Sequence, residues 1–418
     1  MKIALIGNMN FTNYVLTKLL RKKGIDAHLF LLDNENEKFL VENEDGFLKD
    51  NYPSWITKCN WGSQWSFLKN NAKDIQQKFS DFDFIIACGY APAFLEKGKI
   101  HNFLFLPYGS DLYQIPFWDR LPRVYNPLYF ILNLLISYYQ RKGIQNCRGV
   151  SLVATFEGYE NALMKIGVQN NRIELGFAID MDLFNIQKIS NANKLYTNEN
   201  FLRIVKIKEQ YDIIVFSPTR HIWTSQNLKN DPLTSKGNNI LIEGVARAIH
   251  SKKINVLLIL VKIGNDIDNS KKLIEQLKIK NNVIWIEPIP RQELRYFYFI
   301  SDIIGDQFGQ KAGYGAISVE GFSMERPVLL SLENTKVKFS SIIEEPPCLN
   351  VNNSTDISNY INDYINNREK YVAIGKNARQ WVEKYKGDGL INEYIRLFNH
   401  LKNGNSIDQF HPQFLKND

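Results

Sequence analysis

The feature of this sequence that most limits its possible folds is a glycine-rich turn between a strand pattern and a helix pattern. An apolar run ends at Ile304, and glycines recur in the segment 305–315 that follows. A helical pattern comes next, and Pro327 ends it just before another short apolar run. This order is typical of a doubly wound α/β domain. Because the first N–H groups of such a helix have no partner in the helix, the turn is suited to an anion, most often a phosphate.

The helix after this turn carries the residues of a known motif. Tyr314 and Gly315 are followed by Glu320 and then by Arg326-Pro327-Val328. The pattern resembles the donor-binding signature E-x7-E of retaining glycosyltransferases with the GT-B fold, in particular family 4. The resemblance assigns Glu320 to the ribose hydroxyls of a nucleotide-sugar donor. It also places the segment from Gly313 to Ala316 along the sugar and phosphate pocket.

Two positions differ from the usual motif. Ala312 stands where the family has its first Glu, which contacts the transferred sugar. The pair Asp306-Gln307 is similar to a subgroup that reads D-Q-x-x-x-G-x-Y-G, and we expect Asp306 to take part in donor binding. The sequence therefore leaves the sugar and the stereochemical outcome open.

The strand pattern at 212–216 leads to two further residues of the resemblance. In the family an Arg after this strand and a Lys before the next helix clamp the donor diphosphate, and Arg220 and Lys236 fill those positions. A diphosphate leaving group needs cationic partners as its negative charge develops. We therefore predict that Arg220 and Lys236 are catalytic and donor-binding residues. Gly264, which follows the strand pattern at 255–261, is predicted to lie near the donor.

The N-terminal segment predicts a β-α-β unit. Strand patterns at 2–6 and 27–32 flank a helix pattern that Thr12 is expected to cap and that Gly24 is expected to close. A dinucleotide site is a poor match, because the loop after Gly7 lacks the second and third glycines of G-x-G-x-x-G. The helix is instead expected to face the acceptor, with Asn8 as a candidate acceptor-binding residue.

The loop Pro107-Tyr108-Gly109-Ser110-Asp111 follows a strand pattern and resembles the family's H-G-S/T-D. Tyr108 replaces the family's His, and a tyrosine is a poor base at neutral pH. We expect Tyr108, Gly109 and Ser110 to bind the acceptor. Asp111 is a candidate for acceptor binding or proton transfer, and an equally good interpretation is that it caps the next turn.

A basic-flanked apolar helix is predicted within 120–142. Its apolar core at 127–139 is too short to span a bilayer. The helix can lie on a membrane surface that holds a lipid-linked acceptor, or it can pack in the core, which is the usual place for a helix that is apolar all round. No signal peptide or spanning segment is predicted, so we expect a cytoplasmic protein, with possible peripheral contact at the inner face of a membrane.

Metal, cofactor and nucleic-acid sites are not predicted. Asp81-Phe82-Asp83 has the D-x-D spacing of GT-A metal sites but leads directly into a buried strand pattern, and Asp180-Met181-Asp182 is a second chance match. The four cysteines, Cys59, Cys88, Cys147 and Cys348, have no metal-binding or disulfide spacing, which favours a reducing compartment. The net charge of +7 is compatible with an anionic ligand or an acidic membrane surface.

These patterns predict two doubly wound Rossmann-like domains facing a cleft, as in GT-B proteins. We place an acceptor-binding domain at 1–190 and a nucleotide-sugar-binding domain at 191–385, with an Asn-rich linker at 185–200. A C-terminal helix and tail at 386–418 are expected to pack back on the first domain. Asp180 and Phe184 match the Asp and the Phe of a sequence motif that ends the first domain in the family.

The predicted function is a metal-independent, retaining glycosyltransferase of the hexosyltransferase type. It would move a sugar from a nucleotide diphosphate donor, UDP- or GDP-linked, to a hydroxyl of a glycan or lipid-linked acceptor. Bacterial relatives suggest surface polysaccharide or lipopolysaccharide synthesis. Two alternatives stay open: a GT-B sugar-nucleotide epimerase, and a non-catalytic GT-B subunit that binds a glycan or a partner.

Overall fold

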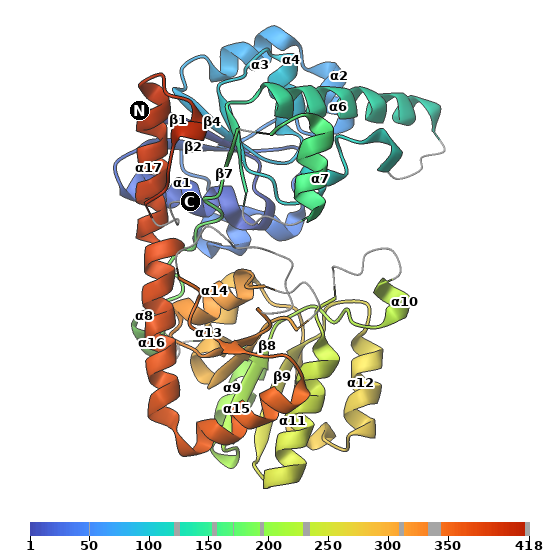
Figure 1. Cartoon of the computed structure of the whole chain (residues 1–418), viewed down its shortest axis with the longest axis vertical. Helices are drawn as coiled ribbons and strands as arrows, with labels where there is room; N and C mark the ends of the chain where they lie inside the picture. Colours follow the sequence, from blue (N-terminus) through green and yellow to red (C-terminus); the bar gives the residue numbers. More distant parts are fainter. Residues whose placement is uncertain are drawn as a thin grey trace. The chain divides into compact units, whose positions relative to one another are not determined.

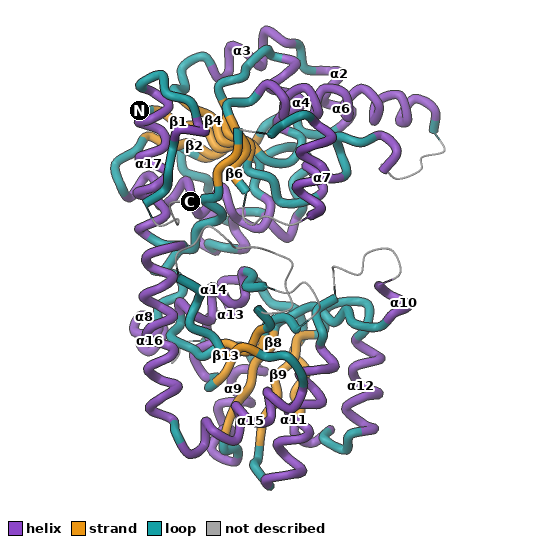
Figure 2. Tube along the Cα trace, in the orientation of Figure 1, coloured by secondary structure: helices purple, strands orange, loops and turns teal. Residues whose placement is uncertain are grey.

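The computed structural model describes residues 1–49, 51–120, 126–152, 157–169, 171–192, 196–228, 235–308, 313–332 and 344–413. Contacts divide the chain into two compact units. The described part of the first unit comes from Met1–Ile179 and Tyr385–Asp418, and that of the second comes from Asp180–Val337 and Glu344–Lys384. Each unit contains one parallel sheet surrounded by helices (Figures 1 and 2). The bounds at 1–190, 191–385 and 386–418 stay a prediction.

The first unit contains a seven-stranded sheet in the order β3-β2-β1-β4-β5-β6-β7. Every pairing is parallel, and β1 pairs with both β2 and β4. The order therefore reverses at β1, which is the mark of a doubly wound sheet. The strands are β1 Lys2–Ile6, β2 Asp26–Leu31, β3 Ile56–Lys58, β4 Phe84–Ala87, β5 Phe103–Phe105, β6 Gly149–Ser151 and β7 Arg172–Ile173.

Helices cover both faces of this sheet, with α3, α4 and α6 above it and α1 below it in the view of Figure 1. Their apolar stripes follow the helical period, and in α1 these buried residues are Val15, Leu16, Leu19 and Leu20. The helices are α1 Thr12–Lys22, α2 Gln64–Lys69, α3 Ala72–Phe79, α4 Ala91–Lys97, α5 Ser110–Tyr113, α6 Pro127–Asn146, α7 Glu157–Ile166 and α17 Asp388–Lys402.

The second unit contains a six-stranded parallel sheet in the order β10-β9-β8-β11-β12-β13. Its strands are β8 Ile213–Ser217, β9 Val256–Val261, β10 Val283–Ile286, β11 Ile303–Gly305, β12 Val328–Leu330 and β13 Leu349–Asn350. Its helices are α8 Ile186–Ala192, α9 Glu199–Ile207, α10 Ser225–Leu228, α11 Asn238–Lys252, α12 Ile267–Gln276, α13 Arg291–Ile300, α14 Ala316–Ser323, α15 Ser354–Asn366 and α16 Arg368–Tyr385. The predicted doubly wound architecture is confirmed.

The C-terminal helix belongs to the first unit. The Tyr394 hydroxyl donates to the Gly176 carbonyl at 2.8 Å, and the Phe398 ring stacks on Phe84 of β4 at 5.9 Å between centroids. These contacts hold α17 against the first sheet. The prediction that the C-terminal helices return to the first domain is confirmed.

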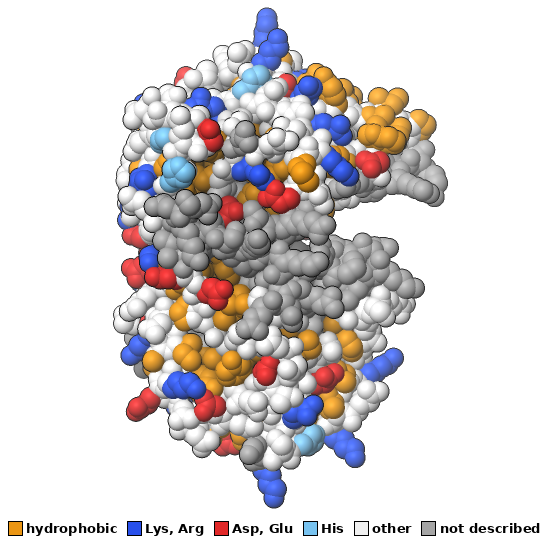
Figure 3. Space-filling view, viewed as in Figure 1, with side chains coloured by type: hydrophobic (Ala, Val, Ile, Leu, Met, Phe, Trp, Pro, Cys, Tyr) orange, Lys and Arg blue, Asp and Glu red, His pale blue; other side chains and the backbone are white. Residues whose placement is uncertain are grey.

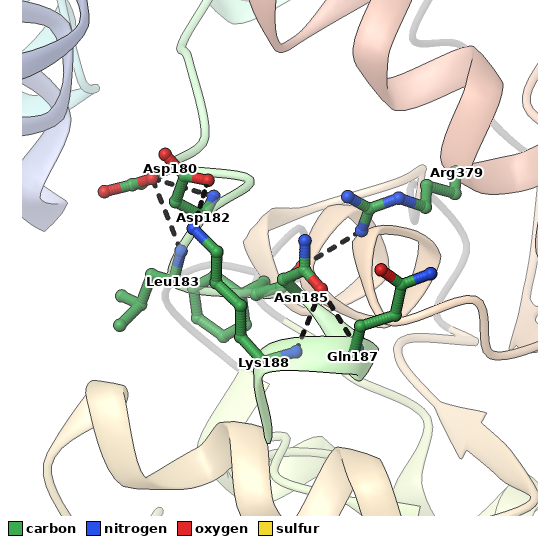
Figure 4. Close-up of polar contacts among 8 residues, drawn as sticks. Asp180, Asp182, Leu183, Asn185, Gln187, Lys188 and Arg379 are labelled. Atoms are coloured by element: carbon green, nitrogen blue, oxygen red, sulfur yellow. Dashed lines mark hydrogen bonds and ion pairs between the residues drawn. The ribbon is translucent and has the colours of Figure 1, made fainter. Parts of the chain in front are cut away.

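The predicted linker at 185–200 is wrong in one respect, because it contains helix α8 and the start of α9. Asn185 accepts from the N–H groups of Gln187 and Lys188 (Figure 4). Asn198 accepts from the N–H group of Phe201. Asparagine is unfavourable inside helices and among the best residues at their N-caps. The Asn-rich composition therefore marked two helix starts rather than an irregular connection.

Helix α6 packs on α4 through a backbone-to-backbone contact at Gly143. A Cβ atom added there would lie 2.2 Å from the carbonyl oxygen of Pro92. The close approach of the two helices therefore requires glycine at this position. One side of α6 is buried.

Replacing Gly143 by Ala should destabilise the protein, although Gly to Ala inside a helix is ordinarily stabilising. The two helices must separate, at a cost of about 1–3 kcal/mol, which lowers the melting temperature by roughly 2–4 °C per kcal/mol. Ile131→Ala, at an exposed position of the same helix, should change stability by less than about 0.5 kcal/mol. A melting temperature that stays the same or rises in Gly143→Ala would contradict the packing.

Candidate functional site

The candidate site of the second unit is built where β8 and β11 end. The two strands are neighbours in the sheet, so segments distant in the sequence meet at their carboxyl ends. The Lys236 N–H donates to the Ile222 carbonyl at 2.8 Å, and the Phe308 N–H donates to the Lys236 carbonyl at 2.9 Å. Lys236 is therefore fixed by backbone bonds to the segments that follow both strands, immediately before α11 begins.

The Lys236 side chain is half-buried, and its ammonium group lies among polar side chains. Its Nζ donates to Oε1 of Gln307 at 2.5 Å. Burial lowers the pKa of Lys236, Asp306 opposes that shift, and Arg220 adds to it. Arg220 is exposed. The structure therefore brings the two predicted phosphate-binding cations into one neighbourhood, and their roles in donor binding stay a prediction.

Asp306 follows β11, and its carboxylate lies at the N-terminus of α14. One of its carboxylate oxygens accepts from the N–H groups of Gly315 at 3.4 Å and Ser318 at 3.2 Å, and from the Ser318 hydroxyl. Burial raises the pKa of Asp306, and its bonds to Ser318 and the charge of Lys236 oppose that shift. The chain's own carboxylate therefore accepts from two of the N–H groups at the start of this helix.

The other predicted donor-binding residues of this unit differ in exposure. Gly313 is buried, the Tyr314 ring packs edge-on against Trp381 at 5.2 Å, and Ala316 is exposed at the first turn of α14. Gly264 has a φ of 109°, and a Cβ there would lie 2.4 Å from the carbonyl oxygen of His221. The conformation and the close approach both require glycine. Ala312 lies outside the described residues.

Glu320 is held in a buried cluster on α14. Its Oε1 accepts from Nε of Arg291 at 2.6 Å, and its Oε2 accepts from the Tyr298 hydroxyl at 2.7 Å. The Arg291 guanidinium lies over the ring of Phe184, 5.2 Å from the centroid. Both carboxylate oxygens therefore have protein partners. The predicted contact of Glu320 with a donor ribose stays a prediction.

The turn that carries Phe184 is fixed by polar contacts shown in Figure 4. The Asp180 carboxylate accepts from the N–H groups of Asp182 at 2.9 Å and Leu183 at 3.4 Å. Arg379 donates to the carbonyl oxygen of Phe184 at 3.3 Å. Asp180 thus acts as a turn cap, and the turn places the Phe184 ring beneath Arg291.

In the first unit, Asp111 closes the loop after β5. It is fully buried, and its carboxylate accepts from the N–H groups of Gly89, Tyr108 and Gly109 at 3.0, 3.1 and 3.0 Å. Burial raises the pKa of Asp111 to about 7, although these hydrogen bonds act to lower it. These bonds hold the loop that precedes α5, and the roles of Asp111 in acceptor binding and proton transfer stay a prediction.

The predicted acceptor-binding residues lie at the ends of β1 and β5. Asn8 is buried, and its side-chain oxygen accepts from the Tyr14 N–H at 2.9 Å. Asn8, and not Thr12 as predicted, therefore supplies the side-chain bond at the start of α1. Tyr108 and Ser110 are half-buried and Gly109 is buried, so Tyr108 and Ser110 retain some access to solvent.

Glu35 is a residue near this site that the sequence analysis missed. Its Oε1 accepts from the Asn8 N–H at 2.7 Å, and burial raises its pKa to about 7. It also contributes to the raised pKa of Tyr108, so the two side chains share one neighbourhood. Glu35 follows a polar turn in the sequence, and nothing in that pattern indicates that the chain folds it against β1.

His221 was also missed. It is fully buried, its Nδ1 lies 2.8 Å from Oγ of Ser270, and the Trp223 indole N–H donates to the same oxygen at 2.9 Å. Among the described residues, Nε2 of His221 has no hydrogen-bond partner. Burial lowers the pKa of His221 to about 4, so the ring is neutral at physiological pH. A single histidine without a motif gives no sequence signal for such a position.

Within the described ranges, no group of three His, Cys, Asp or Glu side chains is placed to hold a metal ion. A search of the described helices found none long and apolar enough to cross a membrane.

The sequence from 233 to 381 matches the family model of glycosyl transferases group 1. These residues form a group 1 glycosyltransferase domain. They contain Lys236, Asp306, Gln307 and Glu320, but not Arg220. A comparison with curated proteins gave no match.

Several solved structures share the fold of this protein. Anabaena Alr3699/HepE in complex with UDP aligns with a TM-score of 0.60 and 16% identity, over 95% of this chain and 98% of that chain. A glycosyltransferase from Rickettsia africae aligns with a TM-score of 0.60 and 16% identity, over 97% and 99%. The glycosyltransferase thus has the GT-B fold. A candidate UDP-N-acetylglucosamine 2-epimerase from Listeria monocytogenes aligns with a TM-score of 0.54 and 11% identity, over 97% and 98%.

The buried, neutral His221 predicts a pH-dependent loss of stability. The pKa of His221 is about 4 in the folded protein and 6.5 ordinarily, so between these values the unfolded chain binds more protons. The free energy of unfolding should therefore fall as the pH is lowered from 6.5 to 4, by up to about 3 kcal/mol from this residue. Melting temperatures measured across this range should fall less steeply in His221→Asn.

The control for this prediction is His250→Asn, since His250 is exposed on α11 of the same unit. Its pH dependence should match that of the wild-type protein. An unchanged pH dependence in His221→Asn would show that the buried ring is not the group that titrates.

Proposed function

We propose that this glycosyltransferase moves a sugar from a nucleotide diphosphate sugar to a hydroxyl acceptor. The observation that carries the proposal is the position of the half-buried Lys236, with Arg220 near it, at the carboxyl ends of β8 and β11. Two cations placed at this edge of a parallel sheet fit a diphosphate. In the transfer the bond from the anomeric carbon to the diphosphate oxygen breaks, a bond to the acceptor oxygen forms, and the acceptor hydroxyl loses its proton.

In this proposal Arg220 and Lys236 stabilise the negative charge that develops on the departing diphosphate. UDP-sugars are the proposed donors, because solved structures of the similar Anabaena protein are complexes with UDP and with UDP-glucose. Retention of configuration and independence of metal ions are proposed from the resemblance to family 4. Glu320 would reach the ribose from α14 only after a change in its bonds to Arg291 and Tyr298.

The acceptor is proposed to bind the first unit, at the half-buried side chains of Tyr108 and Ser110. Asp111 would act as a positioning residue, since its three backbone bonds fix the conformation of Gly109, whose φ is 140°. A surface polysaccharide or lipopolysaccharide precursor is the proposed acceptor class. A similar solved structure is a lipopolysaccharide outer core galactosyltransferase, with a TM-score of 0.54 and 14% identity.

UDP should raise the melting temperature of the wild-type protein. A ligand at 100 times its dissociation constant adds about 2.7 kcal/mol to stability. Lys236→Ala should remove most of this effect, because it deletes the half-buried cation of the site. The matched control is Lys262→Ala, since Lys262 is a half-exposed lysine at the end of β9 that pairs with Glu287. The site assignment would fail if no nucleotide diphosphate raised the melting temperature, or if both variants responded like the wild type.

The two alternative functions are separated by the products formed from a UDP-sugar. Slow release of free sugar and UDP in the absence of acceptor supports a transferase. Formation of an isomeric UDP-sugar would support an epimerase, which the similarity to the Listeria protein keeps open. Binding without any turnover would favour a non-catalytic subunit.

We also propose that the first unit contacts an anionic membrane surface through α6 and its neighbours. Figure 3 shows hydrophobic side chains gathered over the end of α6. Ile131 and Tyr138 of this helix are each 59% exposed, and Trp65 of α2 packs near Tyr129. Helix α6 contains no acidic residue and carries Arg141 and Lys142 near its end. An apolar face with aromatic rings and basic flanks suits the interface of a bilayer. Residues 121–125 of the predicted contact lie outside the described residues.

Replacing Ile131 and Tyr138 together by Glu should weaken binding to vesicles that contain phosphatidylglycerol by about tenfold or more, because apolar surface leaves the bilayer and like charges repel. Sedimentation of the protein with vesicles measures the effect. Val372→Glu is the control, since Val372 is 50% exposed on α16 of the other unit. Equal binding by all three proteins would contradict the proposed contact, while the response to UDP in the second unit should stay the same throughout.

A further inference from the structure

Gln307 lies where the chain leaves β11, and both ends of its side-chain amide are used. Its Oε1 accepts from Nζ of Lys236 at 2.5 Å, and its Nε2 donates to the carbonyl oxygen of Gly313 at 2.8 Å. Its backbone carbonyl accepts from the Ser331 N–H at 3.1 Å. One side chain therefore joins Lys236 to Gly313, which precedes α14.

The amide of Gln307 is neutral, and this matters because of the charged groups around Lys236. The ionisable groups that influence the Lys236 ammonium are Asp306 and Arg220. The Asp306 carboxylate bonds to Ser318 and Gly315 at the start of α14, and no carboxylate among the described residues forms an ion pair with Lys236. A buried cation is costly unless an opposite charge compensates it. The folded protein thus holds a positive charge whose direct partner is neutral.

We propose that Gln307 is a positioning residue for the donor diphosphate. It orients the Lys236 ammonium and ties it to the segment around Gly313, and its neutral amide leaves the positive charge of the lysine available to a phosphate. A carboxylate of the same length at this position would form an ion pair with Lys236. The positive charge of the lysine would then be less available to a phosphate. The inference rests on the proposed function, because it requires Lys236 to bind the diphosphate.

The alternative is that Gln307 only stabilises the fold by joining two loops. The two roles differ in which part of a nucleotide they affect. A positioning role changes the affinity for UDP, which carries the diphosphate, and leaves the affinity for uridine unchanged. A structural role changes both affinities together, or neither.

The experiment compares Gln307→Glu with the wild-type protein by calorimetric titration of UDP and uridine. Gln307→Glu keeps an acceptor for Lys236 but adds a negative charge beside it, so UDP should bind at least tenfold more weakly and uridine with the same affinity. The loss should also depend on pH. In the wild type, UDP affinity should fall at high pH as Lys236 loses its proton, and in Gln307→Glu that fall should move to higher pH because the new carboxylate favours the charged lysine.

Two further variants keep the test decisive. The Met side chain of Gln307→Met has nearly the same length but cannot make the two amide hydrogen bonds. This variant should bind UDP severalfold more weakly and uridine with unchanged affinity. It provides the test if Gln307→Glu does not fold. Gln276→Glu adds the same charge at an exposed glutamine of α12, and it should bind both ligands like the wild type.

The outcomes separate this inference from the proposed function. Wild-type binding of UDP together with unchanged UDP affinity in Gln307→Glu and Gln307→Met would overturn the inference alone. A parallel loss of UDP and uridine binding in a folded variant would also overturn it, in favour of a structural role. Failure of the wild-type protein to bind UDP would overturn the donor assignment itself.

Discussion

The partial burial of one positive charge, at Lys236, is the constraint on which the site of the second unit depends. A buried ammonium group is unfavourable, as the lowered pKa of Lys236 reflects. The amide oxygen of Gln307 and the charge of Asp306 offset part of this cost, and backbone bonds on both sides of Lys236 fix its position. The pairing of β8 with β11 makes this possible, because it places residues 236 and 307 at the same edge of the sheet.

The buried carboxylates of both units are fixed by the chain itself. Asp306 bonds to the start of α14, Glu320 pairs with Arg291 and Tyr298, and Asp111 bonds to backbone N–H groups around Gly109. A buried carboxylate that lacked such partners would cost several kcal/mol. These groups therefore fix the shape of the loops at the sheet edges. The groups left to meet ligands are the ones with access or with unused charge, such as Arg220 and Lys236.

The sequence allowed the architecture to be predicted better than the site. Apolar runs and the turns between them predicted the parallel strands correctly, because burial on both faces of a sheet leaves a strong pattern. The Asn-rich segment before α9 was misjudged, since helix caps and loops favour the same residue. The contacts of Glu35, His221 and Gln307 could not be predicted, because each depends on which strand lies beside which. A polar residue in a loop gives no indication of that neighbour.

The replacement of the family's His by Tyr108 has a chemical consequence for the first unit. An imidazole can accept or donate a proton near neutral pH, whereas burial and the nearby Asp111 and Glu35 raise the pKa of the Tyr108 phenol. Tyr108 therefore keeps its proton and can donate a hydrogen bond to an acceptor oxygen, but it cannot take a proton from that oxygen. The Asp111 carboxylate already accepts hydrogen bonds from three backbone N–H groups. In the proposed function, the edge of the first sheet would therefore orient a hydroxyl group, and Arg220 and Lys236 of the second unit would supply the charge stabilisation that transfer requires.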